Sequence, residues 1–135
     1  MNIDYETLIT AAYSAREYAY APYSGFLVGA ALLDTAGQIH TGCNVENAAY
    51  GPTNCAERTA IFKAVSMGVR NFRAIAIVGA GNTSVFPCGV CRQVLAEFCD
   101  LSDFQIVIAS SITEYRVFSL NDLLPFSFTP NDLNM

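Results

Sequence analysis

The stretch Ala74-Ile75-Ala76-Ile77-Val78 is an uninterrupted apolar run near the middle of the chain. A run of this length predicts a β-strand that is buried on both faces. Helical patterns flank it on both sides, one from Cys55 to Met67 and one from Cys88 to about Cys99. Pro87 introduces the second of these helices, because a proline at a helix start gives up no needed hydrogen bond. A buried strand between two helices indicates a layered α/β fold.

Further elements continue outward from this centre. Asp34 to Gly37 has the composition of a turn and joins two predicted strands into a hairpin. The remaining predicted elements are a helix over Tyr5 to Tyr20, strands at Leu27 to Leu33, Gln38 to Asn44, Gln105 to Ala109 and Tyr115 to Ser119, a helical turn at Asn121 to Leu124, and an irregular tail from Pro125 to Met135. This order predicts a three-layer α/β/α domain with a mixed five-stranded sheet, whose two middle helices pack side by side on one face.

The composition limits the possible functions. The 135 residues fit one domain over 1–135, with 53% hydrophobic and only 14% charged residues, which favours partial burial of the surface in an oligomer. The net charge is −5 and the seven basic residues are scattered, which argues against nucleic-acid binding.

The N-terminus is acidic and no apolar run is long enough to span a membrane, so we expect a cytoplasmic protein without a membrane partner. Thiols stay reduced in that compartment, so the five cysteines favour metal binding or catalysis over disulfides.

Three cysteines have the spacing of metal ligands. Cys88 and Cys91 are three residues apart at a predicted helix start, where both thiols lie on one face. Cys55 stands at the start of the other helix, and a helix N-terminus favours the thiolate that binds metal. Three ligands leave one position of a tetrahedral zinc ion open, which is the arrangement of a catalytic site. We therefore expect one zinc ion per chain.

The residues that follow Cys55 have the chemistry to support such a site. Glu57 is the predicted proton carrier, because a carboxylate beside a metal centre can serve as both general base and general acid. Residues two apart do not share a helix face, so Cys55 must lie at the helix cap if it is to reach the same cavity as Glu57. Arg58 should point back to the cysteines and offset the surplus negative charge of three thiolates.

Several alternatives remain open on these residues alone. One alternative is that the cysteines are ordinary buried thiols and another is a redox pair, but the combination of Cys-Ala-Glu with Cys-x-x-Cys argues against both. Cys43 is a possible fourth ligand of a closed structural zinc site, which would leave Glu57 without a role and fit a non-enzymatic interaction module. His40 is expected at the surface rather than at the metal, and Cys43 and Cys99 are otherwise expected to be buried thiols.

Several segments together resemble one enzyme family. These segments are Ala21-Pro22-Tyr23-Ser24, Phe26 to Leu32, Gly42 to Ala48, Asn54 to Ala60, Pro87 to Gln93 and Leu123-Leu124-Pro125. They resemble the small zinc-dependent cytidine deaminases, in the branch with three cysteine ligands, and they occur in the family's order over most of the chain. The pairing of a Pro-Cys-x-x-Cys segment with a catalytic Glu is also a general signature of zinc deaminases.

This resemblance implies roles for individual residues. Asn44 and Glu46 would bind the ribose hydroxyls, Phe26 would pack on the pyrimidine, and the backbone of Ala56 would hold the edge of the base. The family is homotetrameric with pockets shared between subunits, so an aromatic residue of the tail, Phe126 or Phe128, would close the pocket of a neighbour. The Gly51-Pro52 loop has no assigned counterpart.

The implied reaction is the hydrolytic deamination of cytidine and deoxycytidine to uridine and deoxyuridine, with release of ammonia, in pyrimidine salvage. Glu57 would carry the proton of the attacking water to N3 of the base and later a proton to the departing amine. The alternative substrate is another aminopyrimidine nucleoside analogue. The pair Asn44 and Glu46 favours a substrate that carries a sugar.

Overall fold

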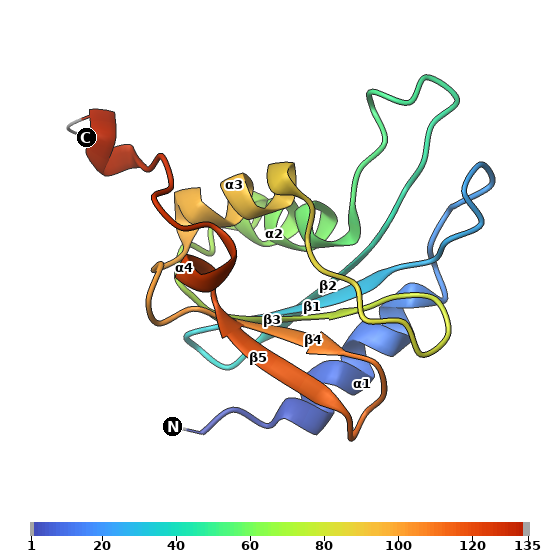
Figure 1. Cartoon of the computed structure of the whole chain (residues 1–135), viewed down its shortest axis with the longest axis horizontal. Helices are drawn as coiled ribbons and strands as arrows, with labels where there is room; N and C mark the ends of the chain where they lie inside the picture. The colour runs from blue at the N-terminus through green and yellow to red at the C-terminus, as the bar shows by residue number, and fades with distance from the viewer. Residues whose placement is uncertain (1, 134–135) are drawn as a thin grey trace.

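The computed structural model describes residues 2–133 and has a mixed five-stranded sheet with helices on both faces (Figure 1). The strands, in the spatial order β2-β1-β3-β4-β5, are β1 (Gly29–Asp34), β2 (Ile39–Cys43), β3 (Phe72–Val78), β4 (Gln105–Ala109) and β5 (Tyr115–Ser119). The helical elements are α1 (Tyr5–Arg16), α2 (Ala56–Ser66), α3 (Gly89–Phe98), α4 (Leu120–Leu123) and a 3-10 turn at Pro130–Leu133. The predicted fold class is confirmed.

The central strand β3 pairs with β1 antiparallel and with β4 parallel. The outer pairs β1–β2 and β4–β5 are both antiparallel. A parallel pair needs a crossover connection, and α3 provides it between β3 and β4. The start of α3 therefore lies beyond the C-terminal end of β3, where ligands commonly bind in α/β sheets.

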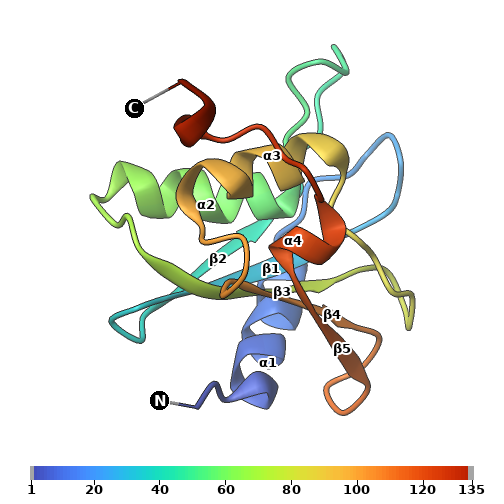
Figure 2. The ribbon, with the colours of Figure 1, turned by 60° about the vertical axis from the view of Figure 1, so that its left-hand side comes forward.

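Two cores lie on opposite faces of the sheet. Ile75 and Ile77 of β3 point to the face covered by α2 and α3, whereas Ala74, Ala76 and Val78 point to the face covered by α1. Figure 2 shows α2 and α3 together on one side of the sheet and α1 on the other. The expectation that the two middle helices share one face is confirmed. None of the helices within residues 2–133 has the length and apolar character needed to cross a membrane.

Glycine at one position of β2 lets α2 approach the sheet closely. A Cβ atom on Gly42 would lie 2.5 Å from the carbonyl oxygen of Ala56 and 2.5 Å from the backbone nitrogen of Ala60. Real Cβ atoms essentially never come so near to backbone atoms. The missing side chain therefore sets how the first turn of α2, which follows Cys55, is seated on the sheet.

The first helix is shorter than the predicted Tyr5–Tyr20 segment. It ends at Arg16, and Tyr20 lies in extended backbone. The Tyr20 nitrogen donates to the carbonyl of Asn44 at 2.9 Å, and the Glu46 nitrogen donates to the carbonyl of Tyr20 at 2.8 Å. These long-range bonds replace the last helical turn, a competition that the apolar spacing of the segment does not reveal. The tail likewise contains the 3-10 turn at Pro130–Leu133, where no regular structure was expected.

The expectation that His40 lies at the surface is wrong. His40 is only 8% exposed, and its Nε2 lies 2.8 Å from Oδ2 of the buried Asp34. His40 lies between the exposed Ile39 and the half-buried Thr41 on β2 and is itself buried, where its Nε2 pairs with Asp34. Cys43 is partly exposed rather than buried, whereas Cys99 is buried as expected.

Candidate active site

Two of the three predicted metal ligands occupy equivalent positions in the fold. Cys55 is the N-cap of α2 and Cys88 is the N-cap of α3, both with extended backbone. Cys91 lies in the first turn of α3, and its backbone nitrogen donates to the Cys88 thiol at 3.5 Å. The prediction that Cys55 lies at the cap is confirmed. The two helix N-termini bring the three thiols together and stabilise negative charge on them.

The three sulfurs form a compact cluster. Sγ of Cys88 lies 3.9 Å from Sγ of Cys55 and 3.4 Å from Sγ of Cys91, and all three lie within 4.8 Å of one another. Ligands at about 2.3 Å on a tetrahedral zinc ion are separated by about 3.8 Å. The spacing and the soft thiol donors therefore fit zinc. Among residues 2–133 this is the group of His, Cys, Asp and Glu side chains that could hold a metal ion, and Cys43 does not belong to it.

The charge of the cluster is balanced by Arg58. Its Nη2 donates to Sγ of Cys55 at 3.3 Å, as predicted from the spacing. A hydrogen bond from Cys91, together with those from Arg58 and Cys88, lowers the pKa of Cys55 to about 5 against the opposing effect of burial. The pKa of Cys91 is raised, because Cys91 holds the proton that it shares with Cys55. The Nε of Arg58 is buried without a hydrogen-bond partner among the described residues.

Glu57 is buried beside the cluster. Its side chain is 4% exposed, and burial, with the nearby Cys55 thiolate, raises its pKa to about 7. Arg58 and a backbone hydrogen bond act in the opposite direction. A carboxyl group with a pKa near neutrality can both accept and release a proton under the same conditions.

The predicted residues line one cavity of about 330 Å³. It is lined by Ser24, Phe26, Val28, Asn44, Glu46, Thr53, Cys55, Ala56, Glu57, Val85, Phe86 and Cys88. All four predicted substrate-binding residues, the predicted catalytic Glu57 and two of the cysteines are therefore brought together. Cys91 and Arg58 are not among the residues that line it. Their individual roles stay predictions.

Asn44 and Glu46 are held in place by the backbone of a neighbouring loop. Oδ1 of Asn44 accepts from the nitrogen of Val28 at 2.9 Å, and its Nδ2 donates to the carbonyl of Phe26 at 2.8 Å. The Glu46 carboxylate accepts from the nitrogens of Tyr23 and Ser24 at 3.0 and 3.1 Å, and also from the Ser24 hydroxyl. These contacts orient both side chains before any ligand arrives and lower the pKa of Glu46, chiefly through the Ser24 hydroxyl.

Comparison with known proteins assigns the family. Residues 2–108 match the model of the cytidine and deoxycytidylate deaminase zinc-binding region. The chain belongs to this deaminase family. It is 51% identical over 132 residues to a cytidine deaminase of Sporosarcina psychrophila, with 98% of this chain and 96% of the relative covered. It is 48% identical to a cytidine deaminase of Halalkalibacterium halodurans, with 98% and 99% covered. The crystal structure of a cytidine deaminase from Burkholderia pseudomallei superposes with a TM-score of 0.87 at 49% identity, covering 93% of this chain and 100% of that one.

The family's cofactor is zinc, and the cluster of Cys55, Cys88 and Cys91 fits the three-cysteine zinc site of this deaminase. This agreement removes the ordinary buried thiols and the redox pair as explanations of the three cysteines.

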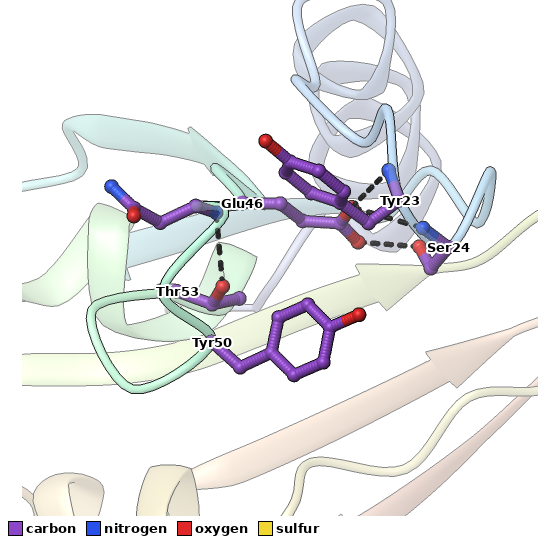
Figure 3. Close-up of a pocket in the computed structure, with 6 residues that line it drawn as sticks. Tyr23, Ser24, Glu46, Tyr50 and Thr53 are labelled. Carbon is purple, nitrogen blue, oxygen red and sulfur yellow. Dashed lines mark hydrogen bonds between the residues drawn. The ribbon is translucent and has the colours of Figure 1, made fainter.

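A second cavity of the deaminase adjoins the first at Glu46. It measures about 300 Å³ and shares Ser24, Glu46 and Thr53 with the catalytic cavity. Figure 3 shows Tyr23 and Tyr50 on either side of it, with ring centroids 6.2 Å apart, and the Glu46 carboxylate bonded to the Tyr23–Ser24 backbone. The loop that carries Gly51-Pro52 thus places Tyr50 opposite Tyr23.

Sequence reasoning assigned no role to Ser24, Val28 and Thr53 of the catalytic cavity, and it also missed the apolar Val85 and Phe86. The latter two directly precede Pro87 and Cys88, so their position next to a predicted zinc ligand was an available signal. The Gly/Asn/Ser-rich character of residues 79–84 made the whole connection look like an ordinary surface loop.

Proposed function

We propose that this chain is a cytidine deaminase that hydrolyses cytidine and deoxycytidine to uridine and deoxyuridine, with release of ammonia. The observation that carries the proposal is the single cavity that joins the buried Glu57, the thiol cluster and the pair Asn44 and Glu46. Residues 1–135 would form one catalytic domain that acts in cytoplasmic pyrimidine salvage.

Chemistry at the base requires a nucleophilic water and a proton carrier. When bound by Cys55, Cys88 and Cys91, the metal supplies the Lewis-acid chemistry that makes water nucleophilic at neutral pH. Glu57 accepts the proton of the attacking water and delivers it to N3 of the pyrimidine as the oxygen adds to C4. It then takes the remaining proton of the hydroxyl added at C4 and passes it to the departing amine, which leaves as ammonia while the C4 carbonyl forms. One carboxylate performs both transfers because its raised pKa lies near neutrality.

The rest of the cavity orients the nucleoside. Phe26 packs on the pyrimidine ring, and the backbone of Ala56 at the start of α2 holds the polar edge of the base. Asn44 and Glu46, already oriented by the loop around Ser24, receive the ribose hydroxyls. A base without a sugar would leave these two polar groups unmatched, which lowers the rate of its turnover.

The active form would be a homotetramer with pockets completed by neighbouring subunits. Support comes from the low charged fraction of 14% and from large aromatic side chains that are exposed in the single chain, of which Tyr50 lines the second cavity. Tyr50 is 76% exposed, Phe126 is fully exposed and Phe128 is 57% exposed. Such aromatic surface is ordinarily covered by a partner.

The test is a comparison of kcat/KM for ammonia release from cytidine, deoxycytidine, cytosine, cytidine monophosphate and a cytosine-containing single strand at fixed salt. Cytidine and deoxycytidine should exceed the others by orders of magnitude. Cytosine lacks the sugar that Asn44 and Glu46 would bind, and the negatively charged chain offers no basic cluster to receive the phosphates of the monophosphate or the strand. Efficient turnover of the monophosphate or the strand would contradict the assignment. Zinc binding without ammonia release from any nucleoside would instead indicate the non-enzymatic interaction module.

A further inference from the structure

Phe86 lines the catalytic cavity together with Glu57 and the predicted sugar-binding pair, Asn44 and Glu46. The other apolar side chains of the lining include Phe26, Val28 and Val85. Of these residues, Val85 packs on the larger core, whereas Phe86 is 38% exposed. The ring of Phe86 is therefore available to a ligand.

Contacts with β5 hold this ring in place. Phe86 meets Phe118 edge-to-face, with ring centroids 5.4 Å apart and an interplanar angle of 61°. The guanidinium of Arg116 lies 4.8 Å from the centroid of the Phe118 ring. Phe118 itself packs against the core, so it gives Phe86 a rigid support. A ligand group that pushes against Phe86 must break the contact with Phe118.

The chemistry of the pyrimidine decides which of its edges contacts the Phe86 ring. One edge of cytosine carries the polar groups O2, N3 and N4, and a polar edge placed against aromatic carbon would lose its hydrogen bonds. The other edge, C5 and C6, is apolar. Phe86 lines the same cavity as Cys88, two residues further along the chain, and the reacting C4 must lie next to the cysteine cluster. Since Glu57 serves N3 on one side of C4, the apolar neighbour on the other side is C5.

We propose that Phe86 is a specificity-determining residue that limits substituents at C5 of the pyrimidine, and that Phe118 positions it. The inference rests on the proposed deaminase function. A hydrogen at C5 fits against the Phe86 ring, whereas a methyl group there must displace it. The chain would therefore discriminate against 5-methylcytidine, and the discrimination would depend on the Phe86–Phe118 contact.

The experiment measures kcat/KM for cytidine and 5-methylcytidine with the zinc-loaded wild type, Phe86→Ala, Phe86→Leu, Phe118→Ala and the control Val117→Ala. Val117 is the neighbour of Phe118 on β5 and is 42% exposed, so its truncation tests for a general effect of weakening that strand. The ratio of 5-methylcytidine to cytidine turnover should rise at least about tenfold in Phe86→Ala. It should rise less in Phe86→Leu and Phe118→Ala, and stay within about twofold of wild type in Val117→Ala.

A binding measurement separates the effect on fit from any effect on chemistry. The Kd of uridine and of 5-methyluridine, measured by calorimetry, should show the same change in ratio. An unchanged ratio in active Phe86→Ala or Phe86→Leu enzyme overturns the role of Phe86 and leaves the deaminase function intact. An equal shift in Val117→Ala also overturns it. A wild type that binds zinc but releases no ammonia from cytidine overturns both proposals.

Discussion

Arg58 donates to the Cys55 thiol at 3.3 Å from the first turn of the helix that Cys55 caps. The cap residue and its charge partner therefore belong to the same helix start. Arg58→Ala removes the cation that offsets the negative charge of the thiolates. We expect zinc affinity to fall by about 10- to 100-fold. Competition with a chelator of known affinity measures the zinc affinity. Arg58→Lys keeps the charge but not the planar donor group, so its zinc affinity should lie between those of the wild type and Arg58→Ala. Equal zinc affinity in all three proteins would show that the arginine has no such role.

Glu57→Gln tests the proton carrier without changing its size. The amide cannot shuttle protons, so activity should fall by about 10²- to 10⁴-fold. The zinc content, measured by atomic absorption, should stay equal to that of the wild type, because Glu57 is not one of the clustered ligands. A variant with normal turnover would remove Glu57 from the mechanism, and a variant that has lost zinc would place it among the ligands.

Gly42→Ala tests whether the seating of α2 sets the geometry of the site. The added methyl group would meet the backbone of Ala56 and Ala60 at 2.5 Å. Overpacking of this kind typically costs about 1–3 kcal/mol of the free energy of unfolding. Because Cys55 is the N-cap of α2, a displaced helix would also displace this ligand, and we expect weaker zinc retention. Gly51→Ala is the matched control, since nothing lies within 4 Å of its Cβ position, and it should change neither quantity.

Asp34 should make the free energy of unfolding depend on pH. Burial would raise its pKa, but the hydrogen bond with His40 and those from the backbone of Gln38 and Ala36 lower it below the ordinary 3.8. A lowered pKa means that the native state favours the carboxylate. The stabilisation is therefore complete above pH 3.8 and is lost as the pH falls through the lower native value.

Asp34→Asn isolates this effect, because the amide oxygen can still accept from the backbone while the charge is removed. Urea unfolding should show a loss of about 1–3 kcal/mol near pH 7. The difference from the wild type should shrink as the pH is lowered toward about 3. A difference that stays constant over this range would mean that the charge of Asp34 does not contribute.

The two tail aromatics should behave differently. Phe126 is fully exposed and has a φ of 56°, a left-handed conformation that costs a side chain about 1 kcal/mol relative to glycine. Phe126→Gly should therefore raise or leave unchanged the melting temperature. The side chain of Gln93 on α3 donates a hydrogen bond to the carbonyl of Phe128 at 2.8 Å. This bond fixes the backbone from which the Phe128 ring extends. Phe128→Ala should lower kcat/KM if this ring closes a neighbour's pocket.

Light scattering on the same variants provides the check on assembly. The wild type and Phe128→Ala should both be tetramers, so that any loss of activity reflects the pocket. Dissociation of Phe126→Gly would show that Phe126 is instead a contact between subunits. An active wild-type monomer would contradict the sharing of pockets altogether.

The fold was largely predictable because the apolar runs and helical spacings are strong local signals. Ala74 to Val78 is buried as its composition predicts, and the strands at 105–109 and 115–119 have the predicted bounds. The metal cluster was predictable because the positions of three cysteines at two helix starts leave few other arrangements. Tyr20 was misplaced because its backbone pairs with Asn44, far along the chain. His40 was misplaced because its partner Asp34 lies across a turn. Phe86 was missed because a single aromatic in a loop carries no periodicity.

The cap positions of α2 and α3 are ordinarily filled by Ser, Thr, Asp or Asn, which satisfy the free amides of the first turn. Here Cys55 makes no capping hydrogen bond, and Cys88 makes only a long sulfur contact to Cys91. A metal ion bound by these thiolates would therefore fix the N-termini of α2 and α3 at the same time. Without the metal, both N-termini would be free to fray. The availability of the metal would then determine resistance to proteolysis as well as activity, because the metal-free protein presents two frayed helix ends to a protease.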